Sequence, residues 1–103
     1  MKTALLHRHN QEVLDRINRL FERKKFRLVS QLMDHENGVF QFRGKKTYLL
    51  PTRNVEGLDL KVYRVSDTVT RVEISVLKND LEVESQVYRD KEDRLIETVY
   101  KLF

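Results

Sequence analysis

Basic and aromatic side chains gather in one short stretch of this sequence, residues 16–27, and such side chains can bind phosphate groups. Lys and Arg pair with phosphate oxygens, and an aromatic ring can stack on a base. If the segments that follow converge on this stretch, we expect a patch with Phe26 or Tyr48 at its edge. The candidate basic patch consists of Arg23, Lys24, Lys25, Arg27, Arg43, Lys45, Lys46 and Arg53.

The same charges also have a purely structural interpretation. Cations in the last turn of a helix complement the helix dipole by about 0.3–1 kcal/mol each, without any ligand. The sequence contains no zinc finger, helix-turn-helix or aromatic RNA-recognition motif that would support binding of nucleic acid. Both interpretations of the basic patch therefore stay open at this stage.

Charge is distributed unevenly along the chain. Residues 1–27 carry a net charge of +5 and residues 58–103 a net charge of −2, within a formal total of +4. A polyanion or an acidic partner would therefore meet the basic N-terminal part first.

Histidines give little sign of a metal site. His7 and His9 have the spacing of a chelating pair, but this spacing works only on a strand, where alternate side chains share a face. On a helix, which we predict here, the two imidazoles diverge. His35 lies in a predicted turn between Asp34 and Glu36, and a lone histidine beside acids is commonplace in a turn. We expect no metal and no cofactor.

Carboxylates offer a weak candidate for catalysis. Glu73, Glu82 and Glu84 are predicted on one face of neighbouring strands, where three acids could hold Mg²⁺ in a hydrolase. Neighbouring Lys and Arg residues favour compensated surface charge instead. No P-loop, nucleophile elbow or HExxH motif is present, so we predict that the protein is not an enzyme.

Apolar and aromatic residues on the outward side of the predicted sheet indicate a protein contact. Such a set is larger than scattered surface exposure and is typical of self-association or partner binding. The alternative is that these are ordinary half-exposed strand residues. The candidate protein-contact face consists of Tyr63, Val65, Leu77 and Tyr88.

Residues 4–24 are predicted to form an amphipathic helix with Thr3 as its N-cap. The apolar stripe recurs at spacings of three and four and contains Leu6, Val13, Leu14, Ile17, Leu20 and Phe21. Two ion pairs are predicted on the polar side, Glu12 with Arg16 and Asp15 with Arg19.

The next segment is ambiguous between strand and helix. Residues 26–33 alternate in a way that favours a strand, although they could also continue the helix. A hairpin turn is predicted at 35–38, because Asn-Gly is a strong turn signal. A second turn is predicted at 44–46, followed by a strand over 47–50 that places Phe42 opposite Tyr48, and a loop over 51–57.

The second half alternates with period two over residues 58–63, 72–76 and 81–84, with a two-residue turn at 79–80. A helix is predicted over 90–103 with Asp90 as its N-cap. The fold class is therefore an α+β two-layer sandwich formed by one domain over residues 1–103. It contains an N-terminal helix, an antiparallel meander of about five or six strands, and a C-terminal helix packed on one face.

Composition limits the class of protein. Apolar residues make up 40% and charged residues 35% of the 103 residues, which is typical of a globular surface-charged domain. We expect no signal peptide and no membrane span. The absence of cysteine excludes disulfides and thiolate chemistry and is compatible with a cytoplasmic location.

These observations predict a small non-catalytic binding or regulatory protein that acts by surface contact with a protein partner or with a second copy of itself. The alternative is a nucleic-acid-binding accessory protein that uses the basic patch at the end of the first helix. A metal-dependent hydrolase is the least supported hypothesis.

Overall fold

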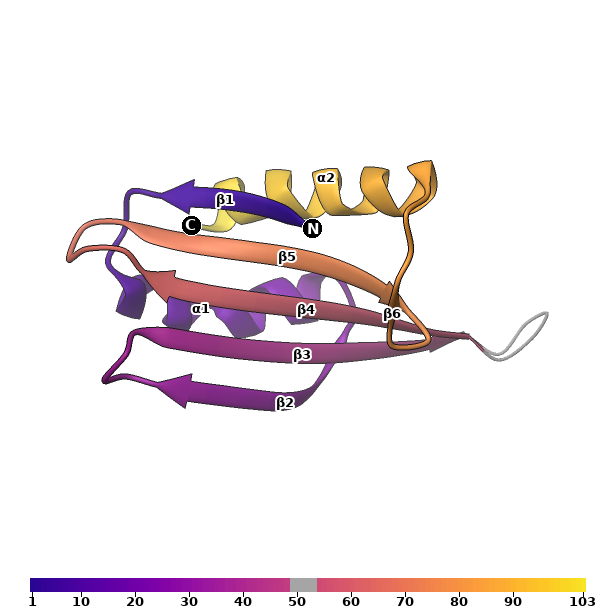
Figure 1. The fold of residues 1–103 in the computed structure, drawn as a ribbon, viewed down its shortest axis with the longest axis horizontal. Coiled ribbons are helices and arrows are strands. Elements are labelled where there is room, and N and C mark those ends of the chain that lie inside the picture. Colours follow the sequence, from indigo (N-terminus) through magenta and orange to yellow (C-terminus); the bar gives the residue numbers. More distant parts are fainter. Residues whose placement is uncertain (49–53) are drawn as a thin grey trace.

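Two helices and a six-stranded antiparallel sheet make up residues 1–48 and 54–103, the part of the chain that the computed structural model describes (Figure 1). The predicted strand residues Leu49 and Leu50 and the patch residue Arg53 lie outside this part. In chain order the elements are β1 (Lys2–Leu6), α1 (Asn10–Arg23), β2 (Arg27–Asp34), β3 (Val39–Tyr48), β4 (Asn54–Arg64), β5 (Thr70–Lys78), β6 (Leu81–Glu82) and α2 (Gln86–Leu102).

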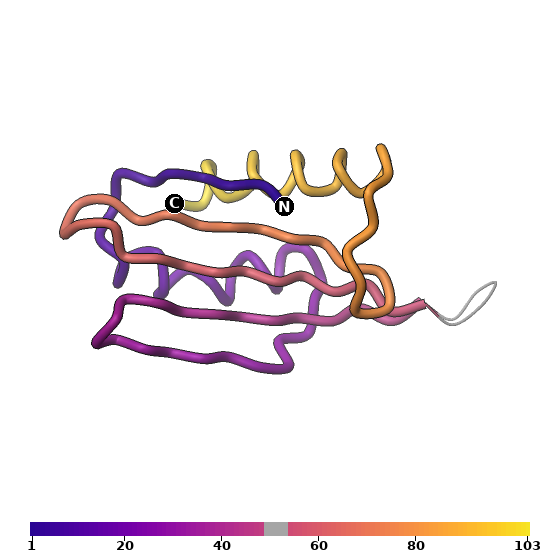
Figure 2. Tube along the Cα trace, in the orientation of Figure 1, coloured from indigo at the N-terminus to yellow at the C-terminus, as the bar shows by residue number. Residues whose placement is uncertain are grey.

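The sheet is an antiparallel meander with one strand added out of sequence. Strands β2, β3, β4 and β5 pair in chain order, and β1 then pairs with the remaining side of β5 (Figure 2). The order is therefore β1-β5-β4-β3-β2, with the short β6 paired to the end of β5. Strands β1 and β2 form the two edges.

The helices make the second layer. Helix α1 lies behind the central strands and contacts β2 and β4, whereas α2 runs along β1 and β5 (Figure 1). The edge strand β2 is therefore far from α2.

The core lies between the two layers and follows from the period-two alternation of the strands. Every second residue of the central strands points toward the helices and is buried, and each such side chain contributes about 1.5–3 kcal/mol. The fully or almost fully buried strand residues include Phe40, Phe42, Leu58, Leu60, Val62, Val72, Ile74 and Val76. The helices contribute Val13, Ile17, Leu20, Phe21, Leu95 and Val99.

This architecture confirms the predicted α+β sandwich and the strand over residues 26–33. The predicted hairpin turn before β3 is also present, with Gly38 at φ 65°. The turn at Asn79 and Asp80 is confirmed as well, and both residues have positive φ, 51° and 66°.

The prediction of helix from residue 4 is wrong. Residues Lys2–Leu6 form β1, with Ala4 opposite Val72, and the helix begins only at Asn10. Its N-cap is His9, whose Nδ1 accepts a hydrogen bond from the Gln11 amide, and not Thr3. A five-residue segment is too short for its periodicity to decide between helix and strand, and pairing with β5 determines the outcome.

The predicted turn at 44–46 is also wrong, because β3 continues through it to Tyr48. Phe42 lies opposite Leu60 and not opposite Tyr48. Packing favours glycine at position 44, because a Cβ atom there would lie 2.6 Å from the Phe21 ring. The predicted loop over 51–57 is contradicted from Asn54 onward, where β4 begins.

Helix α2 begins earlier than predicted. Ser85 is its N-cap, and its Oγ accepts a hydrogen bond from the Tyr88 amide at 3.4 Å. Asp90 is therefore inside the helix, and β6 has only two residues. The Ser85 cap favours a helix from Gln86 onward, and the weak alternation of residues 81–84 does not extend the strand up to it.

The two predicted ion pairs on α1 are not present among the described residues. Glu12 instead pairs with Arg8 at 3.9 Å, and Asp15 accepts a hydrogen bond from Gln11. Arg16 donates to the carbonyl oxygen of Leu102 at 3.0 Å and so ties α1 to the end of α2.

Candidate functional site

The predicted basic patch is divided between the two faces of the sheet. Lys24 and Lys46 come together on the helix side, where they line one pocket. Arg27 and Lys45 are paired neighbours on the opposite face, and Arg43 on that face contacts Asp59 at 3.5 Å. Arg23 lines a different hollow, and Lys25 is exposed after α1.

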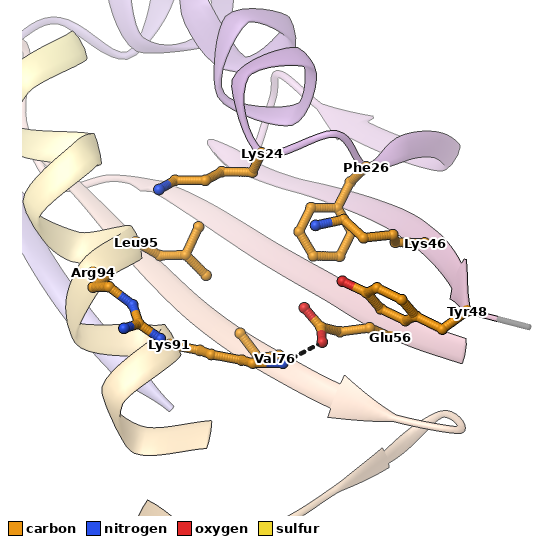
Figure 3. A pocket seen from close by; sticks show the side chains of 9 residues that line it. All are labelled: Lys24, Phe26, Lys46, Tyr48, Glu56, Val76, Lys91, Arg94 and Leu95. Atoms are coloured by element: carbon orange, nitrogen blue, oxygen red, sulfur yellow. Dashed lines mark hydrogen bonds and ion pairs between the residues drawn. The ribbon is translucent and has the colours of Figure 1, made fainter. Parts of the chain in front are cut away.

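The pocket that contains Lys24 and Lys46 has a volume of about 190 Å³. It lies between the end of α1, the first half of α2 and the sheet strands beneath them (Figure 3). Its lining combines cations, two aromatic rings, one carboxylate and an apolar floor. The lining residues are Lys24, Phe26, Lys46, Tyr48, Glu56, Val76, Lys91, Arg94 and Leu95.

Glu56 and Lys91 neutralise each other inside this pocket. Glu56 is buried and accepts a hydrogen bond from Lys91 Nζ through Oε2 at 2.5 Å. Burial alone would lower the pKa of Lys91, but the hydrogen bond and the charge of Glu56 outweigh it and raise this pKa. Lys91 therefore stays protonated at neutral pH, and its stabilising contribution is lost only as the pH rises through its raised pKa.

The other three cations of the pocket have no carboxylate partner in the described chain. Lys46 Nζ lies 4.4 Å from the centre of the Phe26 ring and 6.0 Å from that of Tyr48. The side chains of Lys24 and Arg94 make no ion pair or hydrogen bond with residues 1–48 or 54–103. The pocket therefore carries excess positive charge.

Part of this pocket was not predicted from the sequence. Lys91 and Arg94 are three residues apart on the predicted C-terminal helix, so their shared face was available as a signal. Glu56 gave no signal, because it fell in a predicted loop. Glu56 lies where the end of α1 approaches α2, and this approach depends on tertiary packing.

The predicted protein-contact face is not a single surface. Tyr63 and Leu77 are on the sheet face opposite the helices but near different ends of the strands, and Val65 lies beyond the end of β4. Tyr88 lies on α2 and packs against the core, so its predicted position on a strand is wrong. The capped start of α2 explains this difference.

Charges on the sheet face opposite the helices are largely paired. Arg71 lies 3.6 Å from Glu73 and 4.5 Å from the Tyr63 ring centre. Lys45 contacts Asp80 at 3.2 Å. This compensation favours a solvated face.

Strand β2 presents a different surface, an exposed sheet edge. It has eight residues, and none of them is fully buried. Three apolar side chains are unusually open, Val29 at 41%, Leu32 at 61% and Met33 at 45% exposure. An edge of this length with unpaired backbone groups is a template for pairing with another strand.

Metal ligands do not gather in the described residues, where no group of three or more His, Asp or Glu side chains could hold an ion. His7 and His9 lie between β1 and α1 and not on a helix as predicted. His35 packs edge-on against Phe40 with the ring centres 5.2 Å apart.

No model of a known protein family and no curated protein matches this chain. None of the helices in the described residues is long and apolar enough to cross a membrane.

Proposed function

We propose that this chain is a small non-catalytic binding protein that pairs with a second copy of itself through strand β2. The observation that supports the proposal is the exposed eight-residue edge with Val29, Leu32 and Met33 open to solvent. The other edge, β1, has five residues and runs beside α2. Pairing of two β2 strands would extend one continuous sheet across a two-fold axis.

The apolar residues of β2 are compatible with antiparallel self-pairing. A bulge at Val29 shifts the register, so that Leu28 and Met33 both lie on the helix side, opposite Gly44 and Phe40. With Gln31 opposite its own copy, and Val29 left out as the extra residue, Leu28 reaches the level of Met33 of the second copy. Apolar side chains then meet on the same face, as register requires.

The two ends of β2 are complementary in charge. The same register brings Arg27 to the level of Asp34 of the second copy, on the face opposite the helices. Hydrogen bonds from the Asn37 side chain and amide lower the pKa of Asp34 below 3.8. Asp34 is therefore ionised at neutral pH, and this charge is lost only when the pH falls through the lowered pKa.

The lack of cysteine is compatible with a reducing compartment, and we propose that the protein acts in the cytoplasm. Nucleic-acid binding through the whole basic patch is less supported, because its residues are on both faces of the sheet.

We expect Leu32→Lys to weaken self-association at least about tenfold. The substitution removes the diagonal contact between Leu32 and Leu32 of the second copy. It places two lysines there, about 7–8 Å apart across the two-fold axis. Lysine on an edge strand also opposes pairing in general. Sedimentation equilibrium over a range of concentrations would measure the shift from twice 12.4 kDa toward 12.4 kDa.

Leu81→Lys is the matched control, since Leu81 is 69% exposed and lies on β6, away from β2. It should leave the association unchanged. A wild-type chain that stays monomeric at high concentration, or equal effects of both substitutions, would contradict the proposal.

A further inference from the structure

We propose that the pocket between the end of α1 and α2 binds a free mononucleotide, with its phosphate at Lys24 and Arg94 and its base beside Tyr48. This inference does not depend on self-pairing through β2, because no residue of β2 lines the pocket. It rests on three features of the pocket: unpaired cations, an accessible aromatic ring and an unused carboxylate oxygen.

The cations define the place for the phosphate. Lys24 extends from the end of α1 toward α2, on the side of the pocket where Arg94 and Leu95 lie (Figure 3). The Lys24 and Arg94 side chains have no partner among the described residues, while Lys91 is already held by Glu56. An anion between Lys24 and Arg94 would relieve their repulsion, and phosphate is well matched to the guanidinium group.

The rings and the floor define the place for the base. Tyr48 is 44% exposed, whereas Phe26, Val76 and Leu95 are buried and close the inner side. A flat base can stack on an accessible aromatic ring, as bases do in protein complexes with single-stranded nucleic acid. An inorganic anion would make no use of these apolar surfaces.

Glu56 offers a hydrogen-bond acceptor to the edge of the base. Its Oε2 binds Lys91, and its Oε1 accepts no hydrogen bond from the described residues. In Figure 3 the Glu56 carboxylate lies between Lys91 and the Tyr48 ring. A nucleotide base has amino or imino N–H groups that can donate a hydrogen bond to this oxygen. An aromatic acid without nitrogen has no such donor.

Titration of the protein with guanosine and uridine 5′-monophosphates would test the inference, with amide shifts read by NMR. We expect at least one nucleotide to shift the amides of Lys24, Tyr48 and Leu95. It should bind at least about tenfold more tightly than its nucleoside or inorganic phosphate. No shift with any nucleotide, equal binding of phosphate alone, or binding only of an oligonucleotide would overturn the inference.

Substitutions separate a specific site from general attraction to positive charge. Lys24→Gln with Arg94→Gln should weaken nucleotide binding at least about tenfold. Arg19→Gln with Arg23→Gln removes the same charge from a different hollow and should change binding less than about twofold. Equal loss in both double variants would overturn the site. Sedimentation of the Lys24 and Arg94 variant should show unchanged self-association, so that the two proposals can fail separately.

Discussion

Phe40→Ala is expected to lower the free energy of unfolding by about 3–5 kcal/mol. Phe40 is 0% exposed and lies on β3 between Met33 of β2 and Val62 of β4. Its ring fixes the β2–β3 hairpin against the helix layer, and alanine would leave a cavity there. Small domains have about 5–15 kcal/mol of stability, so much of it would be lost. Urea unfolding followed by circular dichroism measures the change.

Two other substitutions control for this result. Phe40→Leu keeps most of the apolar volume and should cost less than Phe40→Ala. Leu81→Ala should change stability by no more than about 0.5 kcal/mol, since Leu81 is exposed on β6. A loss below about 1 kcal/mol for Phe40→Ala would contradict the position of Phe40 in the core.

Gly44→Ala should lower the free energy of unfolding by about 1–3 kcal/mol. The new Cβ atom would lie 2.6 Å from Cδ1 and Cε1 of Phe21 and 3.1 Å from Cβ of Phe26. Phe21 is itself buried, so its ring has no free space to move into. Helix α1 would be pushed away from β3, and the midpoint of urea unfolding would fall.

Gly57→Ala is a matched control for the Gly44 prediction. Gly57 lies on β4, and its nearest neighbour would be Leu77 Cβ at 3.3 Å, a much milder contact. Phe21→Leu should also reduce the penalty of Gly44→Ala, because the two groups meet directly. If Gly44→Ala and Gly57→Ala cost the same, close packing of Phe21 on Gly44 is wrong.

Period-two alternation made most of the sheet predictable. Leu58, Leu60 and Val62 alternate with polar residues, and the structure buries all three on the helix side. The stripe of α1 from Val13 to Phe21 was equally clear, since its apolar spacing extends over several turns. These patterns can be read from local sequence, because the spacing of apolar residues alone shows which face of a helix or strand is buried.

Features that depend on distant contacts were not predictable. Gly44 looks like a turn residue in the sequence, but its lack of a side chain serves the Phe21 ring, which belongs to another element. Residues Lys2–Leu6 become a strand only because β5 has a free side to pair with. Neither partner is visible from local spacing.

The candidate pocket was predictable in part for the same reason. The basic patch predicted from the sequence contains both Lys24 and Lys46, and the structure brings these two side chains to one pocket. Glu56, Lys91 and Arg94 come from elements whose packing could not be deduced from spacing. The division of Arg27, Arg43 and Lys45 onto the other face follows from continuation of β3 through the predicted turn.

Hydrogen exchange at two protein concentrations tests self-pairing through β2 most directly. The β2 amides that point away from β3 have no backbone partner in a monomer. In a dimer they donate hydrogen bonds across the interface. We predict that some amides of Arg27–Asp34 exchange more slowly as concentration rises, while those of β1, Lys2–Leu6, do not change. Exchange in β2 that is fast and independent of concentration would contradict the proposed function.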